Sequence, residues 1–282
     1  MTALRTAAPA KLNLWLRVVA RRPDGFHEIR SELVLLELAD DLLLLSGASG
    51  LRVESDEDDG VPRIAADNLA WHGLLTGLGR DPQLECLILH KRIPAAAGLG
   101  GGSSDAAAAW QLGRALRGAP AEPSAAELAS LAAIGADVPF FAAGAPRATV
   151  AGIGEHVTPE PPLPSDAVVV ALPAFRLTTA AVFAELREAD WSGHDADGKG
   201  NDLLAPARRL RPELDDLFRL VVSAGGRPQL TGSGPAVFFR TADLERAAAV
   251  AVRLRRAGVR VWETRLRAEA GRIEQVSDEE EG

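Results

Sequence analysis

Four of the five residues from Gly98 to Gly102 are glycine, and this cluster constrains the local fold more than any other feature of the chain. Residues 84–90, LECLILH, form an apolar segment typical of a buried strand. The alanine-rich segment after the glycines is typical of a helix that stops at Gly118 and Pro120. Consecutive glycines can adopt positive φ angles, so neighbouring backbone N–H groups can point at one place. The sequence therefore predicts a strand, an anion-binding loop and a helix, in that order.

A phosphate group is the ligand that this loop fits best. The helix is expected to start at about Ser104, which would bring its positive dipole end to the loop beside the hydroxyls of Ser103 and Ser104. A flexible turn would contain the same glycines. The Walker pattern is ruled out because no Gly-Lys-Ser/Thr follows, and the dinucleotide fingerprint would need glycine at position 103. The glycine loop and the H-R-D and D-F-G motifs of protein kinases are absent from the sequence as well.

Residues 11–18, KLNLWLRV, alternate strictly between apolar and polar side chains, which predicts a half-buried strand. Lys11 and Asn13 share the polar face of this strand. The turn sequence RPDG at 22–25 separates the strand from FHEIRSELVLLEL, so the two segments are expected to pair in antiparallel fashion.

Two helices are expected in the rest of the first half. Asp67 or Asn68 is a candidate N-cap of a helix that Gly79 closes. Ser124 and Glu127 have the spacing of a capping box, and Gly135 offers the C-terminal stop of that helix, directly before Asp137. The proline-rich segment TPEPPLPSD at 158–166 suggests a domain boundary near residue 160.

The second half is predicted to be an α+β domain, so the chain divides into domains at 1–160 and 161–282. The expected order is a strand at 167–173, a helix at 179–188, two helices between 202 and 224, a strand–turn–strand at 230–240, a helix at 241–257 and a strand at 259–266. The last six residues, SDEEEG, form an acidic tail that is expected to be disordered.

Charge and composition exclude several classes of protein. The net charge is −8 and aromatic residues make up 5% of the chain, which argues against a nucleic-acid binder. No apolar run approaches the roughly 18 residues of a membrane span, and the N-terminus does not resemble a secretory signal, so a cytoplasmic protein is expected. The single cysteine, Cys86, is expected in the core. The only lysines are Lys11, Lys91 and Lys199, and at least one of them is expected to have a role that arginine cannot fill, although composition bias could also explain their small number. Lys199 is expected to be a surface-loop residue.

Three motifs resemble the signatures of the GHMP small-molecule kinases. PAAAGLGGGSSDAAAA at 94–109 resembles their P-x-x-x-G-L-G-x-S-S phosphate loop, PAKLNLWL at 9–16 resembles their first motif, and LTGSGPAVFF at 230–239 resembles their third. RPDGFHEI, ADNL and GADVPFF are similar to motifs of the members that act on a diphosphocytidyl substrate. The six motifs cover nearly the whole chain in family order. The resemblance implies a two-domain α+β fold, with a ribosomal-protein-S5-like ATP-binding domain followed by a ferredoxin-like domain.

The resemblance also implies an activity. We expect ATP-dependent phosphorylation of the 2-hydroxyl of 4-diphosphocytidyl-2-C-methyl-D-erythritol, on the route to isoprenoids, with ATP and Mg²⁺ as cofactors and no nucleic acid, membrane or obligate protein partner. One alternative is another GHMP enzyme, of the mevalonate or homoserine kinase type, for which the motif DGFHEI would have no use. A second is a non-catalytic nucleotide-binding module, which would be expected to lack Lys11 or Asp137.

The resemblance implies roles for residues that would contact the alcohol substrate. Asp137 would be the general base, with Lys11 orienting it and stabilising charge. From the residues alone, Asp137 could instead cap a turn and Lys11 could extend from an exposed strand face. Asn13 is assigned to the acceptor alcohol and His27 to a polar contact with the cytosine. Phe26, at a position where many members have tyrosine, would stack on the cytosine. Phe183 also belongs to the substrate set, although it could equally be a core residue. Thr231 and Gly232 complete the set, although their glycine turn could equally be a tight hairpin.

The remaining implied residues would bind ATP. Asn68 and Lys91 match positions near the adenine and the phosphates, although Lys91 could equally be a solvated strand end. The spacing of the histidines and of Cys86 does not suggest a zinc site. No protein ligand is assigned to Mg²⁺, because Ser104 and Asp105 are both plausible ligands. The phosphate loop is expected to consist of Pro94, Ala95, Ala96, Ala97, Gly98, Leu99, Gly100, Gly101, Gly102, Ser103 and Ser104.

Overall fold

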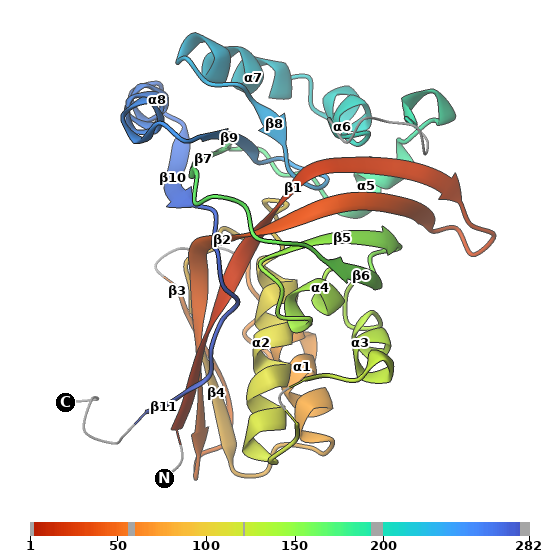
Figure 1. Ribbon diagram of the computed structural model, residues 1–282, viewed down its shortest axis with the longest axis vertical. Helices are drawn as coiled ribbons and strands as arrows, with labels where there is room; N and C mark the ends of the chain where they lie inside the picture. Colours follow the sequence, from red (N-terminus) through yellow and green to blue (C-terminus); the bar gives the residue numbers. More distant parts are fainter. Residues whose placement is uncertain (1–2, 56–59, 121, 193–199, 277–282) are drawn as a thin grey trace.

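The computed structural model describes residues 3–55, 60–120, 122–192 and 200–276, which form two β-sheets with helices packed on them (Figure 1). The first sheet has seven strands, in the order β11-β1-β2-β4-β3, with β5 paired to β2 and β6 paired to β5. β3 and β4 are parallel, and the other pairs are antiparallel. The strands are β1 (Ala3–Arg21), β2 (His27–Ser46), β3 (Gly50–Ser55), β4 (Glu85–Lys91), β5 (Arg147–Gly152), β6 (His156–Pro159) and β11 (Glu274–Val276).

The predicted antiparallel pair around residues 22–25 is confirmed, and its strands are longer than the motif that predicted them. β1 and β2 run side by side from Arg21↔His27 to Ala3↔Leu45. The prediction that β1 is half-buried is wrong at its centre, because Lys11 and Asn13 are each only 4% exposed. The second half of the chain covers the face of β1 that the alternation of apolar and polar residues predicted to be exposed.

Helices cover one face of the first sheet (Figure 1). Leu74 and Leu78 of one helix and Leu112 of the next pack on Leu42 and Leu44 of β2. The apolar side chains that recur at helical spacing on these helices therefore pack on the inward face of β2. The helical elements of this half are η1 (Ala65–Asp67), α1 (Leu69–Leu78), α2 (Gly101–Leu116), α3 (Ala125–Leu131) and α4 (Val138–Ala142).

The predicted helix ends are partly confirmed. The side chain of Asn68 accepts a hydrogen bond from Ala70 N and caps α1, and Gly79 closes this helix at φ 68°. Both hydrogen bonds of the predicted capping box join Ser124 and Glu127. The expected helix start at Ser104 is wrong by three residues, because Gly100 takes a left-handed conformation and α2 starts at Gly101. The helix after Ser124 ends at Leu131, before the expected glycine stop.

The second sheet has four antiparallel strands in the order β10-β7-β9-β8, as expected for an α+β unit. The helix predicted at 179–188 is shorter, since α5 ends at Ala184 and a separate turn follows. The acidic tail at 277–282 lies outside the described residues. The elements are β7 (Ala167–Leu172), α5 (Thr179–Ala184), η2 (Glu188–Asp190), α6 (Leu204–Leu210), α7 (Leu214–Ser223), β8 (Gln229–Leu230), β9 (Val237–Thr241), α8 (Leu244–Arg256) and β10 (Arg260–Arg265).

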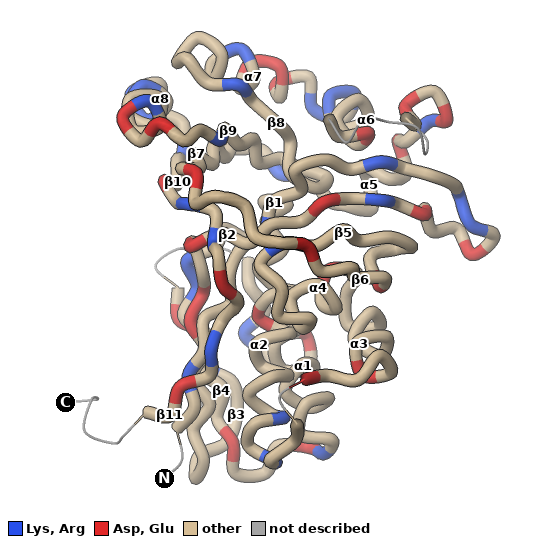
Figure 2. The backbone as a smooth tube through the Cα atoms, viewed as in Figure 1, with Lys and Arg blue, Asp and Glu red and all other residues tan. Residues whose placement is uncertain are grey.

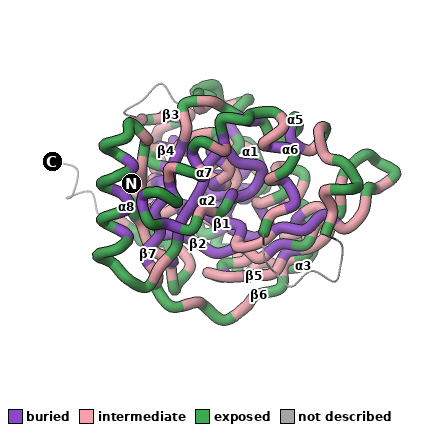
Figure 3. Tube along the Cα trace, turned by 90° about the horizontal axis from the view of Figure 1, so that it is seen from above, coloured by how far each residue is buried: buried purple, intermediate pink, exposed green. Residues whose placement is uncertain are grey.

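The two sheets share a hydrophobic core. Leu12 and Val34 of the first sheet pack in one buried cluster with Val168 and Phe238 of the second. Buried residues gather along the centre of the molecule, where β1 and β2 lie (Figure 3). The chain also returns from the second sheet to the first, because β11 pairs with β1. The division at residue 160 stays a prediction. Among the described residues, no helix is both long and apolar enough to cross a membrane.

The contact between α1 and α2 gives a test of this packing. A Cβ atom added at Gly77 would lie 2.2 Å from the carbonyl oxygen of Trp110, a backbone atom of α2. We expect Gly77→Ala to lower the free energy of unfolding by about 1–3 kcal/mol, because the helices must separate and overpacked cores typically lose this much. Urea unfolding of the variant measures the loss.

The control for this prediction is Thr76→Ala, a change at an exposed position of the same helix. Thr76→Ala is expected to stay within about 0.5 kcal/mol of the wild-type protein, as surface substitutions usually do. Equal stability of Gly77→Ala and the wild-type protein would contradict the close helix contact.

Candidate active site

A cavity of about 610 Å³ lies between the glycine loop, β1 and the second half of the chain. All residues from Pro94 to Ser103 line it, together with Asn68 and Lys91. Lys11, Asn13 and Asp137 line it from the first half, and Phe183 and Gly232 line it from the second. Most of the residues that the sequence singled out therefore surround one space. Ser104 and Thr231 are buried beside the cavity, at 1% and 0% exposure.

The glycine loop has the geometry of an anion site. Ala96, Gly98 and Gly100 all have positive φ angles, of 53°, 80° and 73°. The amide of Ser104 donates to the carbonyl of Gly100 inside α2, so the helix leaves the earlier amides of its first turn without helical acceptors. These amides and the helix dipole favour a negatively charged group at the start of α2.

The turn at residues 231–234 packs directly on the glycine loop. A Cβ atom at Gly98 would lie 2.6 Å from the carbonyl oxygen of Thr231, so no larger residue fits there. The amide of Ala236 also donates to the carbonyl of Ala97. A Cβ atom at Gly232 would lie 3.3 Å from Lys11 Nζ. The two glycine segments therefore form one wall of the cavity, which favours the active-site interpretation of this turn over an isolated hairpin.

Lys11 lies at the centre of a buried polar network. Its Nζ donates to Asn13 Oδ1 at 2.7 Å and lies 3.4 Å from Asp137 Oδ2. Asn13 Nδ2 donates to Ser31 Oγ at 2.8 Å. The backbone amide of Asn13 donates to Thr231 Oγ1 at 3.1 Å. A lysine in this network cannot extend from an exposed strand face, so that alternative is wrong.

Asp137 is open to the cavity on one side. Its side chain is 33% exposed, whereas that of Lys11 is 4% exposed. Asp137 precedes α4, yet among the described residues its carboxylate makes no capping hydrogen bond to that helix. The alternative prediction, that Asp137 caps the turn, is therefore wrong. The carboxylate thus pairs with Lys11 and borders the cavity.

A second buried charge cluster supports the glycine loop, and sequence analysis missed one of its members. Lys91 forms ion pairs with Asp40 of β2 and with Asp105 of α2, the latter at 2.6 Å. Burial alone would lower the pKa of Lys91, but Asp105 and Asp40 raise it above its ordinary value. Burial raises the pKa of Asp105 well above its ordinary value. Asp40 had no motif to mark it, because it lies in a strand far from the loop in sequence.

Asn68 lines the cavity with little capacity left for a ligand. Its Oδ1 accepts from Ala70 N, and its Nδ2 donates to the carbonyl of Pro62 at 2.6 Å. Both hydrogen bonds hold the start of α1 at the edge of the cavity. The predicted contact of Asn68 with the nucleotide stays a prediction.

Aromatic side chains gather beside the cavity where cytosine recognition was predicted. His27 stacks on Phe183, with ring centroids 5.4 Å apart, and the rings of His27 and Trp191 are nearly perpendicular, with centroids 6.1 Å apart. Burial, and then the charge of Arg21, lower the pKa of His27 from 6.5. Phe26 is 59% exposed, and neither Phe26 nor His27 belongs to the described lining of the cavity, which Phe183 reaches. The structure thus brings together His27 and Phe183, but not Phe26.

Two oxygen atoms near the start of α2 are without partners in the described part of the chain. Ser104 Oγ and Asp105 Oδ1 are both buried and make no hydrogen bond there. Buried polar atoms normally have a partner, so these two are candidates for a ligand contact. Within the described ranges, no three His, Cys, Asp or Glu side chains come close enough to hold a metal by themselves.

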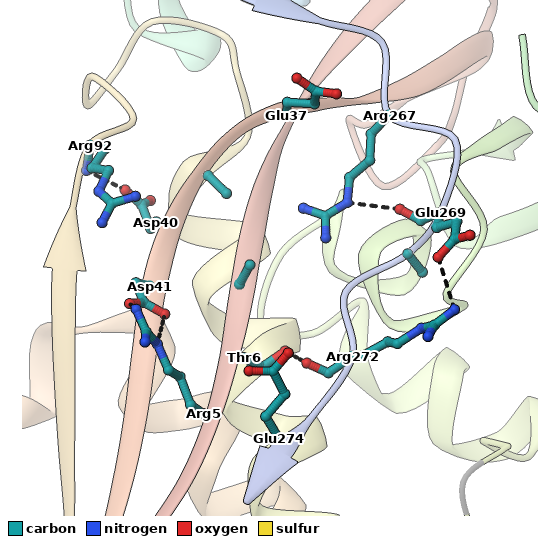
Figure 4. Close-up of a pocket in the computed structure, with 13 residues that line it drawn as sticks. Arg5, Thr6, Glu37, Asp40, Asp41, Arg92, Arg267, Glu269, Arg272 and Glu274 are labelled. Atoms are coloured by element: carbon teal, nitrogen blue, oxygen red, sulfur yellow. Dashed lines mark hydrogen bonds and ion pairs between the residues drawn. The ribbon is translucent and has the colours of Figure 1, made fainter. Parts of the chain in front are cut away.

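Another cavity, of about 470 Å³, lies between β1, β2 and the segment before β11 (Figure 4). Carboxylates and arginines alternate around it, and several are paired with one another. Arg5 forms an ion pair with Asp41, and Arg272 pairs with Glu269 at 2.9 Å. This balance of charge gives no preference for a phosphate, in contrast to the glycine loop.

Comparisons with known proteins agree with the site. Residues 67–145 match the family described as GHMP kinases N terminal domain, and residues 180–260 match GHMP kinases C terminal. The solved structure of a homoserine kinase from Cytophaga hutchinsonii superposes with a TM-score of 0.66 over 96% of this chain and 97% of that one, at 16% identity. At that identity, the match shows a shared fold only.

Relatives with higher sequence identity specify the family within the GHMP kinases. The 4-diphosphocytidyl-2-C-methyl-D-erythritol kinase of Verminephrobacter eiseniae is 39% identical, covering 82% of this chain and 83% of its own. The enzyme of that name from Anaeromyxobacter is 38% identical, covering 90% and 87%. A crystal structure of 4-(cytidine 5'-diphospho)-2C-methyl-D-erythritol kinase is 35% identical and superposes with a TM-score of 0.76 over 93% and 98% of the two chains. The chain therefore belongs to the 4-diphosphocytidyl-2-C-methyl-D-erythritol kinase family of GHMP kinases.

Proposed function

We propose that this kinase transfers the γ-phosphoryl group of ATP to the 2-hydroxyl of 4-diphosphocytidyl-2-C-methyl-D-erythritol, giving the 2-phosphate and ADP. The observation that carries the proposal is the position of the Lys11–Asp137 pair, which faces the glycine loop across one cavity. His27 and Phe183 supply an aromatic site beside the same cavity. The cavity thus offers a phosphate site and a base, and Phe183 at its edge, with His27 stacked on it, offers a surface for a flat heterocycle.

The reaction needs a proton acceptor at the alcohol. The substrate oxygen forms a bond to the γ-phosphorus as the bond from that phosphorus to the β,γ-bridging oxygen breaks, and ADP leaves. Asp137 takes the hydroxyl proton, and Lys11 stabilises the negative charge that develops on the oxygen. Asn13 holds Lys11 in place through the 2.7 Å hydrogen bond. Most of the catalysis then comes from alignment of the two substrates, as is usual for phosphoryl transfer.

The phosphates of ATP are bound by local groups and not by the overall field of the protein. The net charge is −8, and Figure 2 shows basic and acidic residues interleaved along the chain. The amides of the glycine loop and the first turn of α2 provide the positive potential instead. His27 and Phe183 are assigned to the cytosine, which needs a stacking surface and a polar contact.

The unpaired oxygens at the start of α2 are the candidate protein ligands for Mg²⁺. Either Ser104 Oγ or Asp105 Oδ1 would contact it, because this ion prefers oxygen ligands and needs few of them from the protein. When bound, the ion would neutralise charge on the phosphates. The few protein ligands available agree with an ion that enters with the nucleotide.

Turnover with three alcohols tests the proposed function. The purified protein is incubated with ATP and Mg²⁺ together with the diphosphocytidyl substrate, mevalonate or homoserine, and ADP release is followed. We expect ADP release with the diphosphocytidyl substrate only, since only it can use the aromatic site at His27. Preferred turnover of mevalonate or homoserine would contradict the substrate, and no turnover by protein that binds ATP would contradict the activity.

Replacement of Asp137 tests its role as base. Asp137→Asn retains the size of the side chain but cannot accept the proton, so we expect kcat to fall by about 10²- to 10⁴-fold with little change in the KM for either substrate. Steady-state kinetics measure both constants. Asp81→Asn makes the same change at an exposed position and should leave kcat unchanged. Loss of less than a few-fold in Asp137→Asn would remove Asp137 from the mechanism.

The pH dependence of substrate binding tests His27. Its pKa is lowered from 6.5 by burial and by the charge of Arg21, so the neutral ring predominates at pH 6.5 and the cationic form grows as pH falls. We expect the KM for the diphosphocytidyl substrate to rise with falling pH, with a midpoint below 6.5. The NMR titration of His27 gives its midpoint independently. A midpoint above 6.5 in either measurement would contradict this prediction.

A further inference from the structure

Asp40 anchors both ends of the glycine loop. Its Oδ1 accepts hydrogen bonds from the amides of Arg92 and Ile93, at 2.5 and 2.8 Å, where the chain leaves β4 and enters the loop. Its Oδ2 pairs with Lys91, which in turn pairs with Asp105 at 2.6 Å, where α2 has begun. A single carboxylate on β2 thus connects the beginning and the end of the segment from 92 to 105.

The anchor lies behind the loop and does not contact the ligand space. The Asp40 side chain is fully buried, and Asp40 lies outside the described lining of the active-site cavity. It borders the other cavity, beside Arg92, as Figure 4 shows. Lys91, in contrast, does line the active-site cavity, and a Cβ atom at Gly101 would lie 3.5 Å from Lys91 Nζ. The ammonium group is therefore held against the backbone that would bind the phosphates.

We propose that Asp40 is a positioning residue for ATP: by holding Lys91 and the amides of Arg92 and Ile93, it sets the spacing of the phosphate loop relative to α2. This inference rests on the proposed kinase function. Glycines give the loop no stiffness of its own, since each residue can take many backbone conformations. The spacing must come from outside the loop, and the buried ion pairs with Asp40 and Asp105 provide it.

The charge count makes this proposal testable without unfolding the protein. The cluster contains two carboxylates and one ammonium group, so Asp40→Asn leaves one charge of each sign buried. Removing Lys91 would instead leave two unpaired buried carboxylates, which is strongly destabilising. An asparagine at position 40 retains an oxygen for the two amides but has no charge to hold Lys91.

The matched control is Asp41→Asn, the same substitution at the next residue of β2. Asp41 pairs with Arg5 on the other cavity and has no contact with Lys91 among the interactions of the described residues. ATP dissociation constants are measured by calorimetry with Mg²⁺ for the wild-type protein and both variants. KM values for both substrates, kcat and thermal unfolding midpoints are measured alongside.

We expect Asp40→Asn to raise the dissociation constant and the KM of ATP by at least about ten-fold, because small misplacements of binding groups have effects of this size. Its kcat at saturating ATP and its KM for the diphosphocytidyl substrate should stay within about two-fold of the wild-type values. Asp41→Asn should change none of these constants. A general weakening of the fold would not raise the KM of ATP alone, because it would change the constants for both substrates.

Three outcomes would overturn the inference. They are unchanged ATP affinity in folded Asp40→Asn, tighter ATP binding in that variant, and equal effects on both substrates. If Asp40→Asn does not fold, Asp40→Ser, which leaves the same neutral pair with a smaller side chain, decides between the same outcomes. If the wild-type protein itself fails to bind ATP, the proposed function has failed and not this inference.

Discussion

Three segments from distant parts of the chain meet at the active site because two of them have no side chain at the point of contact. The carbonyl of Thr231 approaches so close to Gly98 that a Cβ atom there would lie 2.6 Å away. Gly232 similarly leaves space for the Lys11 ammonium group. β1 completes the arrangement, since the amide of Lys11 donates to the carbonyl of Leu99 at 2.9 Å. The positions of the Lys11–Asp137 pair, the glycine loop and the wall from the second half all depend on this backbone contact.

The active site places charged groups where water is largely excluded. Lys11, Lys91, Asp40 and Asp105 are all almost completely buried, and each has at least one oppositely charged partner. Buried charge is costly without such partners, so these pairs must stay together. The result is a rigid set of donors around a loop that is flexible in isolation. A protein with a net charge of −8 can thereby bind a polyanion through a local site.

The sequence predicted local structure well wherever one short pattern decides it. The Asn68 cap, the Ser124–Glu127 capping box and the antiparallel pair across residues 22–25 each depend on contacts between near neighbours in the chain. The start of α2 was misplaced because Gly100 and Gly101 weaken the pattern, although the left-handed Gly100 permits the helix to begin there. β11 is short and edge-paired, and only its pairing with β1 makes it a strand.

For the site, the sequence by itself determined the chemistry: a glycine loop before a helix, a lysine in an alternating strand, an aspartate before an apolar turn and a histidine after a tight turn. Only the tertiary structure decided which of these groups meet. It buried Lys11 and set it 3.4 Å from Asp137, stacked His27 on Phe183, left Phe26 exposed and recruited Asp40 to the loop. The physical reason is that burial and pairing of charges are properties of packed surfaces, which bring together residues far apart in the chain.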